Sequence, residues 1–176
     1  MQSEKNALRR YARKILSEMT GEEKRKESDL IISRLRKLEK FKNAERILLY
    51  YPMDDEVDVR VLFEDERVLF PFIDEDVMDY ARPPLKKGMF GIPEPVWKHP
   101  VTFDNAILIA PALAFSSLHY RLGRGMGYYD RYIRRMRGKI YAVGLVYERT
   151  YGIDIPTSPY DEEFDMVITS DLQGIH

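Results

Sequence analysis

Arg121-Leu122-Gly123-Arg124-Gly125-Met126-Gly127-Tyr128-Tyr129-Asp130 places three glycines at alternate positions, with one arginine before them and another among them. The segment that follows, 129–136, has the apolar spacing of a helix. Glycines allow main-chain N–H groups to approach a ligand closely, and a helix N-terminus adds a partial positive charge. The motif is neither a P-loop nor a dinucleotide fingerprint, and a flexible surface turn is the competing interpretation. Two guanidinium groups in one loop favour a site for phosphate or another anion.

Short apolar runs on both sides of this loop predict the strands of a sheet. Residues 106–111 are continuously apolar, as in a central parallel strand, and this run leads toward the loop. The other predicted strands are 47–51, 67–73, 77–81, 140–147 and 164–169, while 57–61 alternates like a strand and 88–95 is a loop by its glycines and prolines. Because strands and helices alternate, we expect an α/β fold. It should be a single three-layer domain over residues 1–176, with a mainly parallel sheet flanked by helices and a ligand site at the strand C-terminal ends.

Two amphipathic helices are predicted ahead of the first strand. The first covers 3–19 with Ser3 available as its N-cap, and Thr20 with Glu23 forms a capping-box pattern for the second, which carries Leu30 on its inner face. The spacing alone favours a solvated helix face for the basic residues of the first helix, namely Lys5, Arg9, Arg10, Arg13 and Lys14.

Composition excludes several classes of function. The chain has 176 residues, of which 44% are hydrophobic, and 28 basic residues balance 29 acidic residues to a net charge of −1. That balance gives no reason to expect a nucleic-acid partner, and the lack of an apolar run of about eighteen residues excludes a membrane span. The absence of cysteine excludes disulfides and thiolate catalysis, and the charged N-terminus is unlike a secretory signal. We expect a cytoplasmic protein that is a monomer, with an oligomer left open.

An acidic cluster and three scattered histidines bear on metal binding. Four acids crowd 53–58, directly after the predicted strand 47–51. At a strand C-terminus such a cluster can hold a metal or a cationic group of a substrate, although the pattern alone favours a solvated turn. His99, His119 and His176 have no ligand spacing, which argues against zinc.

Residues 121–130 closely resemble the signature of the 5-formyltetrahydrofolate cyclo-ligase family, also called 5,10-methenyltetrahydrofolate synthetase, and the resemblance runs nearly the length of the chain. Lys5-Asn6-Ala7-Leu8-Arg9 matches the Lys-x-x-Leu-Arg of the family's first helix, and Glu56 matches a glutamate that follows a strand. Residues 111–115 are similar to Pro-Gly-Leu-Ala-Phe, with Ala112 in place of glycine. In 156–165, Tyr160 stands where the family has histidine, and it is followed by the matching Asp161 and Asp165. The family has a short helix near 57–61, which we adopt there in place of a strand.

The resemblance implies three groups of site residues. For ATP it implies Lys5, Arg9, Arg121, Leu122, Gly123, Arg124, Gly125, Met126, Gly127, Tyr128 and Tyr129. For the folate substrate it implies Tyr51, Glu56, Arg124, Gly125, Met126, Gly127 and Tyr128. For Mg²⁺, the implied cofactor, it implies Asp130 and Asp161. Phe90 and Trp97 are further candidates for apolar walls of the site, although ordinary core positions are the favoured interpretation.

The activity that the resemblance implies is the ATP-dependent conversion of 5-formyltetrahydrofolate to 5,10-methenyltetrahydrofolate with release of ADP and phosphate. Arg124, Tyr128 and Asp130 are the implied catalytic residues. Two other classes of function stay open. A sugar-phosphate isomerase would use Asp130 or Glu56 as general base and would consume no ATP, and a non-enzymatic binder would leave bound ATP intact. Separate matches in the right order weigh against both.

Overall fold

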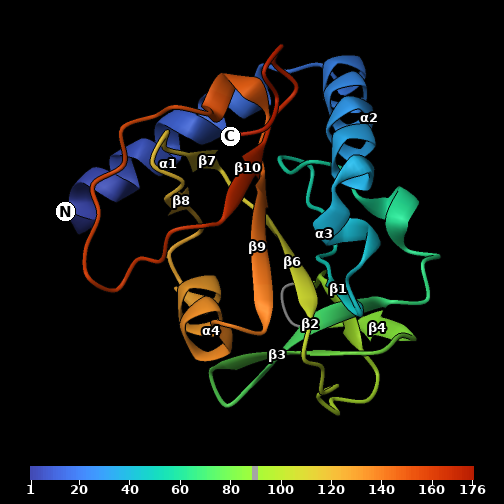
Figure 1. Ribbon diagram of the computed structural model, residues 1–176. Coiled ribbons are helices and arrows are strands. Elements are labelled where there is room, and N and C mark those ends of the chain that lie inside the picture. The colour runs from blue at the N-terminus through green and yellow to red at the C-terminus, as the bar shows by residue number, and fades with distance from the viewer. Residues whose placement is uncertain (89–90) are drawn as a thin grey trace.

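The computed structural model describes residues 1–88 and 91–176, and these form a six-stranded sheet in the order β10-β9-β6-β1-β2-β3 (Figure 1). All neighbouring strands are parallel except β2 and β3, which form an antiparallel pair at one edge. The strands of this sheet are β1 (Arg46–Leu48), β2 (Val68–Asp74), β3 (Val77–Ala81), β6 (Ala106–Pro111), β9 (Ile140–Leu145) and β10 (Met166–Ile168). Two smaller antiparallel pairs are β4 (Leu85–Lys87) with β5 (Pro93–Pro95), and β7 (Ala114–Phe115) with β8 (Arg121–Leu122).

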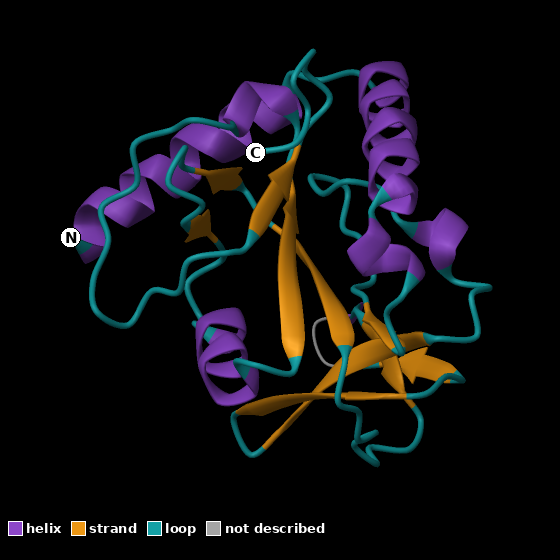
Figure 2. Ribbon diagram, in the orientation of Figure 1, coloured by secondary structure: helices purple, strands orange, loops and turns teal. Residues whose placement is uncertain are grey.

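Helices cover both faces of the sheet, as Figure 2 shows. The helices are α1 (Gln2–Ser17), α2 (Gly21–Lys37), α3 (Glu39–Lys42) and α4 (Tyr128–Met136), with 3-10 turns at Arg60–Leu62 and Glu148–Thr150. On one face α1, α2 and α3 pack with Ile47, Ile107 and Val143 into one core cluster. On the other face α4 packs with Leu48, Leu108 and Ala142. Successive strand residues point to opposite faces, so a continuously apolar strand such as β6 supplies both clusters. The predicted α/β fold, with a mainly parallel sheet flanked by helices, is confirmed.

Local chemistry sets the start of each of the first two helices, and only the start of the second was predicted correctly. Thr20 and Glu23 form the predicted capping box: the Glu23 amide donates to Thr20 Oγ1 at 3.1 Å, and the Thr20 amide donates to Glu23 Oε2 at 2.8 Å. The prediction that Ser3 caps α1 was wrong, because the helix begins at Gln2 with Met1 as N-cap. There the amino-terminal ammonium forms an ion pair with Glu4, the acidic residue of the first turn, at 2.9 Å. Leu30, predicted to face inward, is 42% exposed.

Several strand boundaries differ from those predicted. The predicted strand 47–51 is shorter, since β1 ends at Leu48, and 57–61 holds no strand but leads into the 3-10 turn at Arg60–Leu62, close to the short helix adopted from the family. Within the predicted loop 88–95, Pro93–Pro95 forms β5, where Lys86 lies opposite Glu94. Proline lacks the N–H donor that strand pairing uses, so a segment with two prolines is predicted as a loop from its sequence.

The two aromatic candidates for site walls have different outcomes. Trp97 is 59% exposed, so the favoured assignment of this side chain to the core was wrong. The prediction for Phe90 lies outside the described residues. Within the described part of the chain, no helix has the length and apolar character that crossing a membrane requires.

Candidate active site

The strand order reverses between β1 and β6, and this reversal locates the candidate site. From β1 the chain passes to β2 on one side, whereas from β6 it passes through β7, β8 and α4 to β9 on the other side. The segments that follow β1 and β6 therefore separate at the C-terminal ends of two neighbouring strands. Open α/β sheets bind their ligands at this position.

The glycine loop, residues 121–127, leads from β8 into α4. Gly125 has a φ of 108° and Gly127, the N-cap of α4, has a φ of 68°; both values are in the left-handed region that favours glycine. The first hydrogen bond of α4 runs from the Arg131 amide to the Gly127 carbonyl at 3.1 Å. The preceding amides of the first turn have no partner within a helix, so the positive end of α4 lies beside the glycine loop.

The side chain of Arg121, the first residue of the glycine loop, explains the glycine at position 123. Its Nε donates to the Pro111 carbonyl at 2.5 Å, and its guanidinium lies 4.4 Å from the ring centroid of Tyr129. A Cβ on Gly123 would come within 2.1 Å of Arg121 Nη1, so the loop closes on this side chain only because residue 123 has none. Burial lowers the pKa of the Arg121 guanidinium from its ordinary value, while Tyr129 and Asp130 act in the opposite direction. An anion above the loop would stabilise this positive charge.

Arg124 joins the glycine loop to the segment that follows β1. Its Nη2 lies 2.5 Å from Asp55 Oδ1 and 3.0 Å from Glu56 Oε1. The Glu56 side chain is only 7% exposed, and its other oxygen accepts from the Met53 amide at 3.0 Å. The acidic cluster at 53–58 is therefore more than a solvated turn, because Asp55 and Glu56 share one guanidinium.

Lys5 and Arg9 lie on one face of α1, four residues apart, and both are buried. Lys5 Nζ contacts both carboxylate oxygens of Asp161, at 2.8 and 2.7 Å. Arg9 donates from Nε to the Gly123 carbonyl at 2.8 Å and from Nη1 to Asn6 at 2.6 Å. The solvated face that spacing alone favoured holds for the exposed Arg10, Arg13 and Lys14, but it was wrong for these two residues.

The two candidate metal ligands have pKa values shifted in opposite directions. Burial raises the pKa of Asp130, although the Glu162 amide donates to its Oδ1 at 2.9 Å and acts against the shift. Burial alone would also raise the pKa of Asp161, but the hydrogen bonds from Lys5 and the Ser158 amide outweigh it and hold the pKa below its ordinary value. Among the described residues no three acidic or histidine side chains gather as a metal-binding group. A cation here would thus take two carboxylates at most from the chain, and Mg²⁺ fits that set because it retains much of its hydration.

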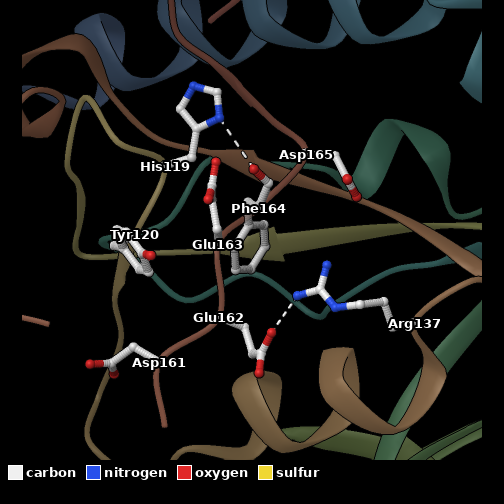
Figure 3. A pocket seen from close by; sticks show the side chains of 8 residues that line it. All are labelled: His119, Tyr120, Arg137, Asp161, Glu162, Glu163, Phe164 and Asp165. Carbon is white, nitrogen blue, oxygen red and sulfur yellow. Dashed lines mark hydrogen bonds and ion pairs between the residues drawn. The ribbon is translucent and has the colours of Figure 1, made fainter. Parts of the chain in front are cut away.

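A cavity of about 580 Å³ adjoins Asp161 and is lined by His119, Tyr120, Arg137 and residues 161–165 (Figure 3). Glu162 forms an ion pair with Arg137 and accepts from Arg134 Nε at 2.7 Å. Arg134 lies in α4 and Arg137 directly follows it. Together they hold Glu162, whose amide donates to Asp130. His119 Nδ1 lies 3.2 Å from the Phe164 carbonyl oxygen.

The remaining predicted site residues differ in their burial and in their contacts. Leu122 is buried in the core, whereas Met126 is 61% exposed. Tyr128 is half-buried, with the Arg131 guanidinium 5.0 Å from its ring centroid. Tyr51 is half-buried and packs against Phe63, with 5.5 Å between the ring centroids.

Three further residues, Asp55, Asn6 and Glu162, contact the predicted ones, and sequence reasoning did not single them out. Asp55 lies in the acidic cluster next to Glu56, so composition pointed to the segment but not to this carboxylate. Asn6 is three residues from Arg9 on α1, and that spacing was a usable signal. Glu162 had no local signal, because its role depends on α4 lying against the 156–165 segment.

An α/β protein with a cationic glycine loop at the switch point of its sheet belongs to the broad class that handles phosphorylated ligands. The narrower assignment comes from comparison with known proteins. The model of the 5-formyltetrahydrofolate cyclo-ligase family matches residues 1–170, and the chain therefore belongs to this family.

Individual relatives agree with this assignment. The 5-formyltetrahydrofolate cyclo-ligase of Mus musculus is 26% identical over 192 residues, covering 96% of this chain and 95% of that protein. The solved 5,10-methenyltetrahydrofolate synthetase of Aquifex aeolicus is 30% identical, with a TM-score of 0.80 and coverage of 94% of this chain and 89% of that chain. The Mycoplasma pneumoniae synthetase, at 24% identity, shares the fold with a TM-score of 0.76 over 95% of this chain and 99% of that one.

Proposed function

We propose that this chain catalyses the ATP-dependent cyclisation of 5-formyltetrahydrofolate to 5,10-methenyltetrahydrofolate. The formyl oxygen attacks the γ-phosphorus of ATP, and the bond from that phosphorus to ADP breaks. N10 then attacks the activated carbon, the carbon–oxygen bond breaks, phosphate leaves with the former formyl oxygen, and N10 loses its proton. An amide oxygen is a poor leaving group, so phosphorylation makes an otherwise slow cyclisation possible.

The observation that carries the proposal is the contact of Arg124 with Glu56. It connects the anion-binding glycine loop to the only acidic side chain in the described part of 53–58 that is buried. A reaction between a nucleotide phosphate and a second substrate needs two binding regions that meet at one point. Arg124 lies at that meeting point, where it can neutralise the phosphoryl group in transit.

At the nucleotide end, the proposal assigns the phosphates to Lys5, Arg9 and residues 121–129. Lys5 contacts Asp161 at 2.7 Å, and because an ammonium has three N–H donors it can contact a phosphate oxygen while it keeps this carboxylate. Arg9 donates to the Gly123 carbonyl and thereby fixes the loop against α1. Such positioning and charge neutralisation account for most of the catalysis of phosphoryl transfer.

At the folate end, the proposal assigns the pterin to Tyr51, Glu56 and residues 124–128. The amino-pyrimidinone edge of a pterin presents N–H donors, for which the buried Glu56 carboxylate is a strong acceptor. Tyr128, at the start of α4, would cover the reacting groups and keep water from the phosphorylated intermediate.

Asp130 and Asp161 are proposed to hold Mg²⁺ together with phosphate oxygens and water. When bound, the ion supplies charge neutralisation to the phosphates. The chain's own contribution is to hold the two carboxylates in place: Asp130 through the Glu162 amide and Asp161 through Lys5 and Ser158. We extend the proposal to a cytoplasmic monomer with a single domain: a length of 176 residues suits one domain, and the lack of cysteine suits a reducing compartment.

The fate of the formyl oxygen tests the proposal. With 5-formyltetrahydrofolate labelled with ¹⁸O in the formyl group, the label should appear in inorganic phosphate, with one ADP formed for each methenyl product. Label in water, or product without ADP, would contradict the mechanism. Binding of both ligands with ATP left intact would favour the non-enzymatic binder, and isomerisation of a phosphosugar without ATP would favour the isomerase.

A further inference from the structure

Three buried hydroxyl groups bond to the main chain of three consecutive residues, 56–58. Tyr147 Oη donates to the Glu56 carbonyl at 2.9 Å, and Tyr50 Oη donates to the Val57 carbonyl at 2.7 Å. The Asp58 amide donates to Ser28 Oγ at 3.0 Å. Each of the three hydroxyl-bearing residues is no more than 3% exposed. The main chain around Glu56 is therefore fixed from inside the core.

The hydroxyls come from three different parts of the fold. Ser28 is on α2, Tyr50 follows β1, and Tyr147 follows β9. Ser28 Oγ and Tyr147 Oη are 3.5 Å apart, and because Tyr147 donates its proton to Glu56, Ser28 must be the donor between them. The bonds thus form a directed chain from Ser28 through Tyr147 to the Glu56 carbonyl. Burial raises the pKa of Tyr147 to about 12, so its phenol remains a donor at neutral pH.

We propose that Tyr147, Ser28 and Tyr50 are positioning residues that hold the Glu56 carboxylate at the folate end of the site. The inference rests on the proposed function of Glu56 and goes beyond it. The Glu56 carboxylate itself accepts hydrogen bonds from the Met53 amide and from Arg124. The hydroxyls fix the backbone from which that carboxylate projects, so their loss would loosen one substrate's site and leave the other in place.

The three hydroxyls lie apart from the nucleotide end of the site, so their loss should affect the KM for folate and not the KM for ATP. Within the described residues, the hydroxyl groups of Tyr147 and Ser28 bond to 56–58 and to each other, and neither hydroxyl bonds to α1 or to the glycine loop. Tyr147→Phe should therefore raise the KM for 5-formyltetrahydrofolate roughly tenfold, as expected for one buried hydrogen bond and the partner it leaves unpaired. The KM for ATP should change by less than about twofold, since Arg124 keeps its ion pair with Asp55 and no residue of α1 is altered.

Tyr132→Phe is the matched control. Tyr132 is also buried, and its hydroxyl has no hydrogen-bond partner among the described residues. It lies in the core cluster on the other face of the sheet. This variant removes the same atom from a buried tyrosine, and both KM values should match those of the wild type.

A double-mutant cycle with Glu56→Gln decides whether Tyr147 acts through Glu56. If it does, Tyr147→Phe should change folate affinity by less than about twofold in the Glu56→Gln background. Equal effects in both backgrounds, or an equal rise in the KM for ATP, would overturn the inference. Folate affinity that Glu56→Gln leaves unchanged would overturn the proposed role of Glu56 and the inference with it. Weakened binding in Glu56→Gln with none in Tyr147→Phe would overturn the inference alone. Should Tyr147→Phe unfold, Ser28→Ala gives the same test with a smaller change.

Discussion

Replacing Gly123 by alanine tests how the glycine loop is built. Gly123 does not have a left-handed φ, so backbone strain gives no reason for glycine at this position. The reason is steric, because the new Cβ would lie 2.1 Å from Arg121 Nη1 and 2.8 Å from its Cζ. The guanidinium is the end of a flexible side chain and can move, but it must then leave its place between Pro111 and Tyr129.

The cost of that movement follows from the two contacts that Arg121 loses. A hydrogen bond from a charged donor contributes about 1.5–3 kcal/mol, and a guanidinium over an aromatic ring contributes about 0.5–2 kcal/mol. Replacing glycine by alanine restricts the unfolded chain and returns about 0.4–1 kcal/mol. We therefore expect the variant to lose about 1–4.5 kcal/mol of unfolding free energy.

Urea denaturation followed by circular dichroism measures this loss. Gly21→Ala is the matched control, since a Cβ there meets nothing within 4 Å. In an Arg121→Ala background the steric cause is gone, so Gly123→Ala should then cost less than about 0.5 kcal/mol. A Gly123→Ala variant as stable as Gly21→Ala, or equally destabilised in both backgrounds, would refute the steric explanation.

Four other substitutions separate catalysis from stability. Arg124→Ala should raise the KM of both substrates roughly tenfold or more, since it removes the cation shared by the two ends of the site, and unchanged steady-state kinetics would remove Arg124 from the mechanism. Asp130→Asn should reduce kcat by more than about 100-fold without lowering the melting temperature, because burial already disfavours the charged carboxylate; parallel losses of both would contradict a ligand role. Asp161→Asn should cost about 1–2 kcal/mol at neutral pH, as expected for a partly buried ion pair with Lys5. Because the pKa of Asp161 is lowered, this difference should be present above the ordinary value of 3.8 and disappear as pH falls through the lowered pKa in urea titrations, and a difference that persists in acid would argue against the ion pair. Thr20→Ala should cost about 1 kcal/mol through loss of the capping box, with both KM values unchanged.

The sheet and its helices could be predicted because their signals are local. The continuously apolar run at 106–111 is typical of a buried strand, and the side chains of Thr20 and Glu23 form a capping box at a helix start. The boundary errors arise where a strand is defined by its pairing with a neighbouring segment and not by its own composition. Pro93–Pro95 becomes a strand only because 85–87 lies beside it, and β1 ends at Leu48 although apolar residues continue.

The candidate site could be predicted at the level of segments but not of contacts. The glycine loop, the acidic cluster and the first helix were all identified in sequence, and the structure brings them together through Arg124 and Arg9. The ion pair of Lys5 with Asp161 joins residues 156 positions apart, so no local pattern could reveal it. The same holds for the bond from Tyr147 to Glu56, which crosses from β9 to the segment after β1.

The central claim is that the glycine loop and the Glu56 segment together serve one ATP-dependent cyclisation. The most direct measurement is the near-ultraviolet absorbance of the methenyl product when the purified protein is mixed with 5-formyltetrahydrofolate and Mg²⁺, with and without ATP. We expect this band to grow only when ATP is present, and to grow far more slowly with Arg124→Ala. Growth without ATP, or no growth despite bound folate and ATP, would contradict the account.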